Sequence, residues 1–269
     1  MKIGFIGLGN MGTRIVTLLL DAGHELTLWA RRPASLEPFA DRCTAVNSPA
    51  EVGEASELVG ICVWDENDVA EVMLGDHGVL VGLPAGGVVV VHSTISPAAC
   101  RSLYDEAART GAHLIDAPVS VGANVPKLLV MVGGETETVE RSRLVLESFG
   151  DPVVHLGPVG SGQIAKLINN TLLAATIGIA DDAIDLGARL GLDPAALLAV
   201  LSSASARGTW SSLLAPRIIG GDSAPGGRTH EWATKDVGLT TSLAAQANVS
   251  AGRDVLRMAQ RGSHVLESA

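Results

Sequence analysis

Short apolar runs alternate with helix-length segments through the first half of the chain. The first run, Ile3 to Ile6, is followed by a helical pattern from Met11 to Ala22 and by a second run from Glu25 to Trp29. Such alternation is typical of a parallel sheet with helices on both faces. We therefore predict a doubly wound α/β sheet of the Rossmann type, with further strands at 58–63, 88–92, 112–115, 128–132 and 153–156, the last two extending the same sheet.

The pattern changes at the glycine-rich segment 157–162, after which strand-like runs stop. From Gln163 to about Leu190, apolar residues at helical spacing predict one long interdomain helix that ends before Gly191. Further helices are expected at 194–203, 231–247 and 252–264. We predict a Rossmann dinucleotide-binding domain at 1–160 and, at 161–269, an all-α domain that binds the substrate and dimerises.

Composition and charge narrow the possible partners. The 269 residues are 47% hydrophobic and carry a formal net charge of -10, which supports a globular core and disfavours nucleic acid binding. Cys43, Cys62 and Cys100 have no metal-binding or redox spacing, so we interpret them as reduced and structural, and we predict no metal site. No segment resembles a signal peptide or a membrane span, so we expect a soluble, cytoplasmic protein.

A glycine motif lies between the first predicted strand and the first predicted helix. Gly7 permits a tight turn, Gly9 allows the backbone to approach a pyrophosphate, and Gly12 allows the helix and strand to pack closely. The start of the following helix adds free amides and a partial positive charge. We therefore predict that a dinucleotide binds to the loop Gly7-Leu8-Gly9-Asn10-Met11-Gly12.

The end of the second predicted strand bears on the choice of cofactor. Many NAD enzymes carry an acidic residue there that binds the ribose, but this chain has Arg31 and Arg32. Two guanidinium groups are suited to the 2′-phosphate of NADP, which a carboxylate would repel. We predict NADP as the preferred cofactor and NAD as the alternative; one arginine could instead stack on the adenine or be solvated.

Four segments together resemble, in order and spacing, the β-hydroxyacid dehydrogenases. They are 7–12, Ser93-Thr94-Ile95-Ser96-Pro97, Asp116-Ala117-Pro118-Val119-Ser120, and the stretch from Gly162 through Lys166 to Asn170. The pair Lys235-Asp236 matches a late Lys-Asp pair of the same family, which includes 3-hydroxyisobutyrate dehydrogenase and is related to 6-phosphogluconate dehydrogenase. The resemblance implies hydride transfer between a nicotinamide cofactor and a small β-hydroxy acid or its semialdehyde or ketone.

The resemblance also implies roles for individual residues. Lys166 would act as general acid and base on the substrate oxygen, and Asn170, one helical turn further on, would bind the substrate or fix the lysine. Ser120 would join them in the catalytic group.

Other family positions imply binding contacts. Ser120, Val121 and Gly122 would bind the substrate carboxylate, Thr94 would contact the nicotinamide end of the cofactor, and Lys235 would lie near the cofactor or the carboxylate. Val121 stands where the family has a glycine, so the identity of the substrate does not follow from the resemblance.

Two other functions are considered beside this one. An imine reductase would share the Rossmann domain and the long helix, but such enzymes generally carry another residue at the position of Lys166. A cofactor-binding module without turnover is a second alternative, which the intact Lys166, Asn170 and Ser120 argue against. The apolar surface of the long helix further predicts a homodimer.

Overall fold

The computed structural model describes residues 1–121, 126–219, 231–249 and 252–267. The contacts group the chain into two compact units, Met1–Lys166 and Leu167–Ala269. Within the described ranges, no helix combines the length and the apolar character that crossing a bilayer requires.

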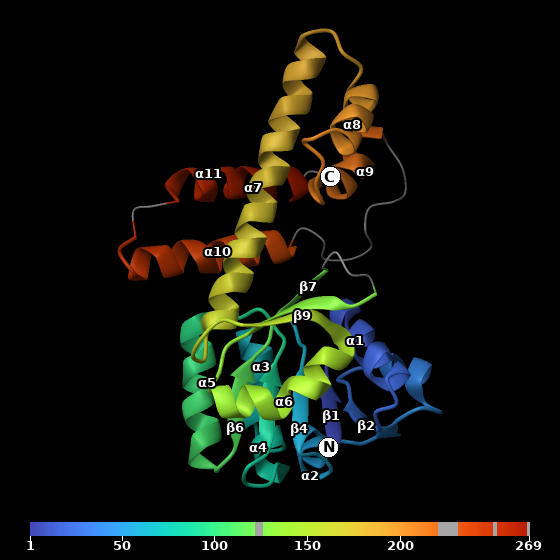
Figure 1. The fold of residues 1–269 in the computed structure, drawn as a ribbon, viewed down its shortest axis with the longest axis vertical. Coiled ribbons are helices and arrows are strands. Elements are labelled where there is room, and N and C mark those ends of the chain that lie inside the picture. Colours follow the sequence, from blue (N-terminus) through green and yellow to red (C-terminus); the bar gives the residue numbers. More distant parts are fainter. Residues whose placement is uncertain (122–125, 220–230, 250–251, 268–269) are drawn as a thin grey trace. The chain divides into compact units, whose positions relative to one another are not determined.

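The first unit contains a six-stranded sheet in which all strands are parallel (Figure 1). Its order is β3-β2-β1-β4-β5-β6, the arrangement of dinucleotide-binding Rossmann domains. The predicted doubly wound sheet is therefore confirmed. The strands are β1 (Ile3–Ile6), β2 (Leu26–Trp29), β3 (Thr44–Ala45), β4 (Leu58–Ile61), β5 (Val88–Val91) and β6 (His113–Asp116).

Helices cover both faces of this sheet because successive strand residues point to opposite sides. In β5, Val88 and Val90 belong to one apolar cluster, which α1 and α6 complete, and Val89 and Val91 belong to the other, with α2 to α5. The helices are α1 (Asn10–Asp21), α2 (Pro49–Glu54), α3 (Glu66–Leu74), α4 (Val79–Gly82), α5 (Pro97–Arg109) and α6 (Thr136–Phe149), with a 3₁₀ helix at Pro33–Phe39.

A second, three-stranded sheet corrects the prediction that the later strands extend the first one. It consists of β7 (Val119–Val121), β8 (Leu128–Val132) and β9 (Gly150–His155), with β7 antiparallel to β8 and β8 parallel to β9. Beside β6, the sheets meet through an isolated bridge from Asp116 to Gly133. Pro118, which has no N–H, ends the parallel ladder here, and the chain turns to pair with β8 instead.

Helices make up the second unit, as the sequence predicted. They are the rest of α7 (Ser161–Arg189), α8 (Pro194–Ser203), α9 (Trp210–Ile219), α10 (Glu231–Gln246) and α11 (Arg253–Glu267). The sequence did not predict α9. Helices α7 and α11 cross closely, since a Cβ at Gly262 would collide with the carbonyl oxygen of Ala174. Arg261 on α11 adds an ion pair to the buried Asp181 on α7.

Candidate active site

The loop between β1 and α1 has the backbone that its three glycines predicted. Gly7 has a φ of +96°, and a Cβ there would collide with the carbonyl oxygen of Cys62. A Cβ at Gly12 would collide with the carbonyl oxygen of Gly7, so α1 packs against its own entry loop. At Gly9, in contrast, a Cβ would meet no atom within 4 Å. Two glycines therefore allow close packing, and the third leaves open space beside the backbone.

The N-terminus of α1 is suited to an anion at this open space. Gly9 is the N-cap and has no side chain to cap the helix, and the first turn contains no acidic residue. The first amides and the positive end of the helix dipole are therefore available to a pyrophosphate. Leu8 is buried and Asn10 is exposed, and together with Met11 they supply the backbone of this loop and of the helix start.

The two arginines after β2 differ in their surroundings. Arg31 is exposed, and its Nη2 lies 2.8 Å from a carboxylate oxygen of both Asp68 and Glu71 on α3. The hydrogen bond and the charge of Asp68 raise the pKa of Arg31. Arg32 is also exposed, and within the described part of the chain its guanidinium has no ion-pair partner. Arg32 is therefore the more available cation for a phosphate.

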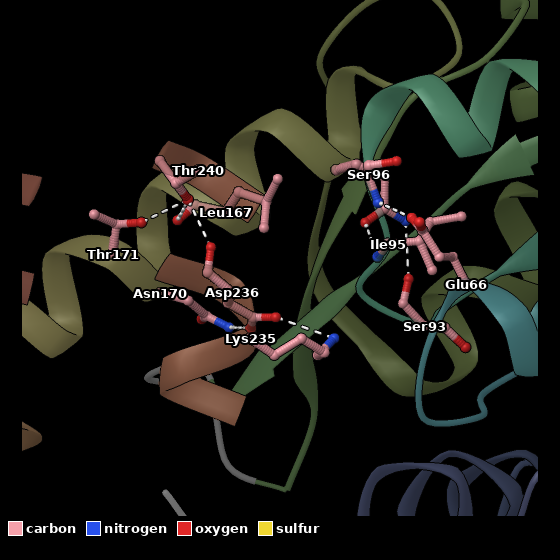
Figure 2. Close-up of polar contacts among 11 residues, drawn as sticks. Glu66, Ser93, Ile95, Ser96, Leu167, Asn170, Thr171, Lys235, Asp236 and Thr240 are labelled. Atoms are coloured by element: carbon pink, nitrogen blue, oxygen red, sulfur yellow. Dashed lines mark hydrogen bonds and ion pairs between the residues drawn. The ribbon is translucent and has the colours of Figure 1, made fainter. Parts of the chain in front are cut away.

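The loop after β5 is fixed on two sides. Ser93 Oγ accepts a hydrogen bond of 2.8 Å from the amide of Val63, which follows β4. Two further bonds come from the buried side chain of Gln163 on α7, whose Nε2 donates to the Ser93 carbonyl at 2.9 Å and whose Oε1 accepts from the Ile95 amide at 3.1 Å. Thr94 lies between these two anchored residues. Figure 2 also shows the Ser96 amide donating to Glu66.

Asp116, the last residue of β6, holds the start of α7. Its buried carboxylate accepts hydrogen bonds from the amides of Gly160, at 2.7 Å, and Gln163, at 2.8 Å. A Cβ at Gly162 would lie 2.8 Å from this carboxylate, so a glycine is needed beside it. Burial raises the pKa of Asp116 to about 6, while the backbone hydrogen bonds oppose that rise.

Lys166 lies on the second turn of α7, just beyond these anchors. It is half-buried, and its positive charge acts on the thiol of Cys62, the residue that follows β4. Burial raises the pKa of that thiol to about 12 despite Lys166, which favours the neutral thiol of Cys62. The lysine thus belongs to the same edge of the sheet as the glycine loop, where the parallel strands end.

The predicted carboxylate-binding stretch follows β6 and belongs to the second sheet. Ser120 and Val121 belong to β7, at one edge of the second sheet, where Ser120 pairs with Leu129. Ser120 is half-buried, whereas Val121 is 58% exposed. Gly122 lies outside the described residues.

Asn170 and Lys235 are held by one carboxylate in the second unit (Figure 2). Asn170 Nδ2 donates to Asp236 Oδ2 at 2.6 Å, and Lys235 Nζ lies 3.1 Å from Asp236 Oδ1. Asp236 is only 2% exposed, so its carboxylate faces these side chains rather than solvent. The sequence supplied the Lys-Asp pair as a signal, but Asp236 was not among the predicted site residues.

Within the first unit, the fold gathers the glycine loop, the Ser93–Ile95 loop and Lys166 where β1, β4, β5 and β6 end. Ligands of doubly wound sheets bind at this edge. Gln163 and Asp116 were not predicted as site residues, because their role depends on bonds between segments far apart in sequence. Among the described residues, no group of histidines, cysteines and carboxylates is arranged to hold a metal.

Comparison with known families agrees with this geometry. Residues 2–157 match the model described as the NAD binding domain of 6-phosphogluconate dehydrogenase. Residues 160–264 match the model described as NAD-binding of NADP-dependent 3-hydroxyisobutyrate dehydrogenase. Together, the two models account for most of the chain and indicate a nicotinamide cofactor.

Individual proteins give the same result. The mitochondrial 3-hydroxyisobutyrate dehydrogenase of Mus musculus is 37% identical over 214 residues, which are 78% of this chain and 64% of the mouse protein. The chain therefore spans less than two thirds of that relative's length. A structure of Mycobacterium tuberculosis 3-hydroxyisobutyrate dehydrogenase with L-serine has a TM-score of 0.80 and 27% identity, and the match covers 99% of this chain and 98% of that one.

A more distant structure shares the fold alone. An imine reductase from Streptomyces aurantiacus has a TM-score of 0.68 and 20% identity, with 100% of this chain and 99% of that one covered. The 3-hydroxyisobutyrate dehydrogenase of Pseudomonas aeruginosa is 33% identical over 259 residues, which are 92% of this chain and 87% of that protein. This relative, the matched domains and the Rossmann fold agree with one another, and the chain belongs to the 3-hydroxyisobutyrate dehydrogenase family.

Proposed function

We propose that this chain is an NADP-dependent oxidoreductase that interconverts a small β-hydroxy acid and its semialdehyde or ketone, with Lys166 as the general acid and base. The observation that carries the proposal is the position of Lys166, on a helix start fixed by Asp116 and beside Cys62 at the sheet edge that bears the glycine loop. The nicotinamide, when bound, supplies or accepts the hydride.

Side chains of the protein would transfer the proton and orient the substrate. In the reductive direction, Lys166 Nζ donates a proton to the carbonyl oxygen as negative charge develops on it, and it takes the proton back in oxidation. The side chain of Asn170, whose Nδ2 is held by Asp236, binds the substrate or fixes Lys166. Ser120, with Val121 and Gly122, binds the carboxylate, and Thr94 and Lys235 contact the cofactor.

Two of the comparisons support the substrate and cofactor classes. The model that matches residues 160–264 is described for an NADP-dependent enzyme. The Mycobacterium tuberculosis relative was solved with L-serine, which is itself a β-hydroxy acid. Val121 replaces a family glycine and is exposed, so we expect the acid pocket to accept a different set of side groups from that of the relatives.

An assay of NADPH oxidation tests the proposed function. The substrate panel is glyoxylate, succinic semialdehyde, methylmalonate semialdehyde and a cyclic imine, after titration of NADPH and NADH by protein fluorescence. We expect turnover with at least one of the acids. Turnover with the imine alone would reassign the chain to imine reduction, and NADPH binding without turnover on any substrate would favour a cofactor-binding module.

Replacement of Arg32 tests the cofactor preference. We expect Arg32→Ala to weaken NADPH binding by about 10- to 100-fold, the loss of one charge-assisted hydrogen bond, and to leave NADH binding nearly unchanged. Arg31→Ala should have a smaller effect, because Arg31 already pairs with Asp68 and Glu71. The measurement is the dissociation constant of each cofactor by fluorescence titration. An equal loss for NADPH and NADH would contradict a contact with the 2′-phosphate.

The exposed apolar side of α7 carries the proposal of a homodimer. Ile168, Leu172, Ile179 and Leu186 follow one another at intervals of four or seven residues and are all more than half exposed. We expect a dimeric mass by light scattering at micromolar concentration and a monomeric mass for Ile179→Asp, which would place a charge in the apolar stripe. A monomeric mass of the unaltered protein would exclude the dimer.

A further inference from the structure

Both polar atoms of the Gln163 side chain form hydrogen bonds within the protein. The side chain is 0% exposed, and its two ends bind two backbone groups of the loop after β5, the Ser93 carbonyl and the Ile95 amide. The partners lie 70 and 68 residues away in sequence. A primary amide offers a donor and an acceptor side by side, so a glutamine satisfies both groups, whereas a carboxylate only accepts and an aliphatic side chain does neither.

The backbone of the same residue is anchored from another strand. The Gln163 amide donates to Asp116 Oδ2 at 2.8 Å, and the Gly160 amide donates to Oδ1 at 2.7 Å. The start of α7 is therefore held at the end of β6 while its Gln163 side chain holds the loop at the end of β5. All of these groups are buried and paired, so moving any one of them would leave a polar group without its partner.

Two candidate functional residues lie immediately beside these anchors. Thr94 lies between Ser93 and Ile95, whose backbone groups bind the side-chain amide of Gln163. Lys166 is three residues after Gln163, on the same helix. The side-chain amide of Gln163 thus connects the backbone on both sides of Thr94 to the helix that carries Lys166. A shift of either backbone would stretch this pair of hydrogen bonds.

We propose that Gln163 is a positioning residue. It keeps Thr94, at the nicotinamide end of the cofactor, at a fixed distance and orientation from Lys166, which transfers the proton. This inference rests on the proposed function, which gives Thr94 and Lys166 those roles. Gln163 itself touches neither cofactor nor substrate. Its effect is on the alignment of hydride and proton transfer, to which catalytic rates are sensitive because displacements near 1 Å slow reactions strongly.

A glutamate in place of Gln163 provides a pH-dependent test. Ionised, Gln163→Glu presents two acceptors and repels the Ser93 carbonyl; protonated, its hydroxyl can donate to that carbonyl while its other oxygen accepts from the Ile95 amide. Complete burial beside the Ser93 carbonyl disfavours the ionised carboxyl and should raise its pKa from the usual value of about 4.3 to between about 6 and 9. We therefore expect kcat to fall about 10- to 100-fold at pH 9 and to recover to within about threefold of the unaltered enzyme at pH 6. Dividing the kcat of Gln163→Glu by the kcat of the unaltered enzyme at the same pH removes the pH dependence that both enzymes share.

Two further variants separate positioning from loss of structure. Gln163→Met, of similar size but without hydrogen-bonding groups, should lose kcat equally at every pH while the Kd for NADPH stays within about threefold, since the pyrophosphate site is intact. Gln246→Glu, at an exposed position on α10, should leave kcat unchanged throughout. A Gln163→Glu to unaltered kcat ratio that does not vary with pH, or a Gln163→Met enzyme with normal kcat, would overturn the proposal.

A second readout does not require turnover. Bound NADPH fluoresces from its nicotinamide ring, so we expect Gln163→Met to bind the cofactor with the usual Kd and a lower nicotinamide emission, because the ring is less well held. Unchanged emission would overturn the proposal even if no substrate were found. Failure of the proposed function would appear separately, as absence of turnover by the unaltered protein or as full activity of Lys166→Ala.

Discussion

Lys166→Ala should lower kcat with a semialdehyde acid by about 10²- to 10⁴-fold, the contribution of a general acid, while the Kd for NADPH remains within about threefold. The physical reason is that alanine cannot supply the proton needed as negative charge develops on the substrate oxygen. The glycine loop and Arg32, which we assign to cofactor binding, are unchanged in the variant. Steady-state kinetics with saturating NADPH, together with fluorescence titration of the cofactor, measure both quantities.

An exposed lysine provides the matched control for this experiment. Lys2 lies at the start of the chain, before β1, so Lys2→Ala should retain normal kcat. Small primary amines added to Lys166→Ala should restore part of the rate, because they can replace the missing proton donor. If Lys166→Ala kept more than about half of the activity, Lys166 would not be the general acid and the proton would have to come from another group.

The stability of the first unit should respond to acid through two buried groups with opposite effects. His92 is buried between the rings of Phe5 and Phe149, and burial lowers its pKa to about 4. Burial also raises the pKa of Asp116 to about 6. As the pH falls from about 6.5 to 4, unfolded His92 takes up a proton that the folded form refuses, so stability is lost. From about 6 to 4, folded Asp116 takes up a proton before the unfolded chain does, so stability is gained.

Over the pH range in which it titrates, each group changes the free energy of unfolding by on the order of 3 kcal/mol. The two changes have opposite signs, so they nearly cancel in the unaltered protein. We expect Asp116→Asn to lose stability more steeply than the unaltered protein between pH 6.5 and 4. His92→Phe should instead gain stability, relative to the unaltered protein, between pH 6 and 4. Urea unfolding at a series of pH values measures the slopes, and the slope rather than the absolute stability is compared.

An exposed apolar residue is the control for these slopes. Leu144 is exposed and carries no titratable group, so Leu144→Ala should follow the pH profile of the unaltered protein. Identical slopes for the His92→Phe, Asp116→Asn and unaltered proteins would mean that neither buried group has a pKa displaced by folding.

Local patterns were enough to predict most elements of this fold. A strand of the central sheet is buried on both faces, so β1, β4 and β5 read as short, continuous apolar runs whatever their neighbours are. The glycine motif was equally readable, because Gly7 needs a positive φ and Gly12 packs against Gly7 in the same loop. The long helix α7 showed its period over many turns. Helix α9 was missed, since Ser211, Ser212 and Pro216 interrupt its apolar pattern.

The sequence by itself determined the Rossmann order of elements, the glycine loop and the candidate lysine, because each is encoded by residues close together in the chain. Only the tertiary structure decided that β8 and β9 form their own sheet, since strand pairing depends on which edge lies nearby. Likewise, it decided that Arg31 pairs with α3, that Asp116 anchors α7, and that Gln163 binds the Thr94 loop. Such bonds join segments 37 to 70 residues apart, and their free energy depends on burial and exact distance, which no local pattern records.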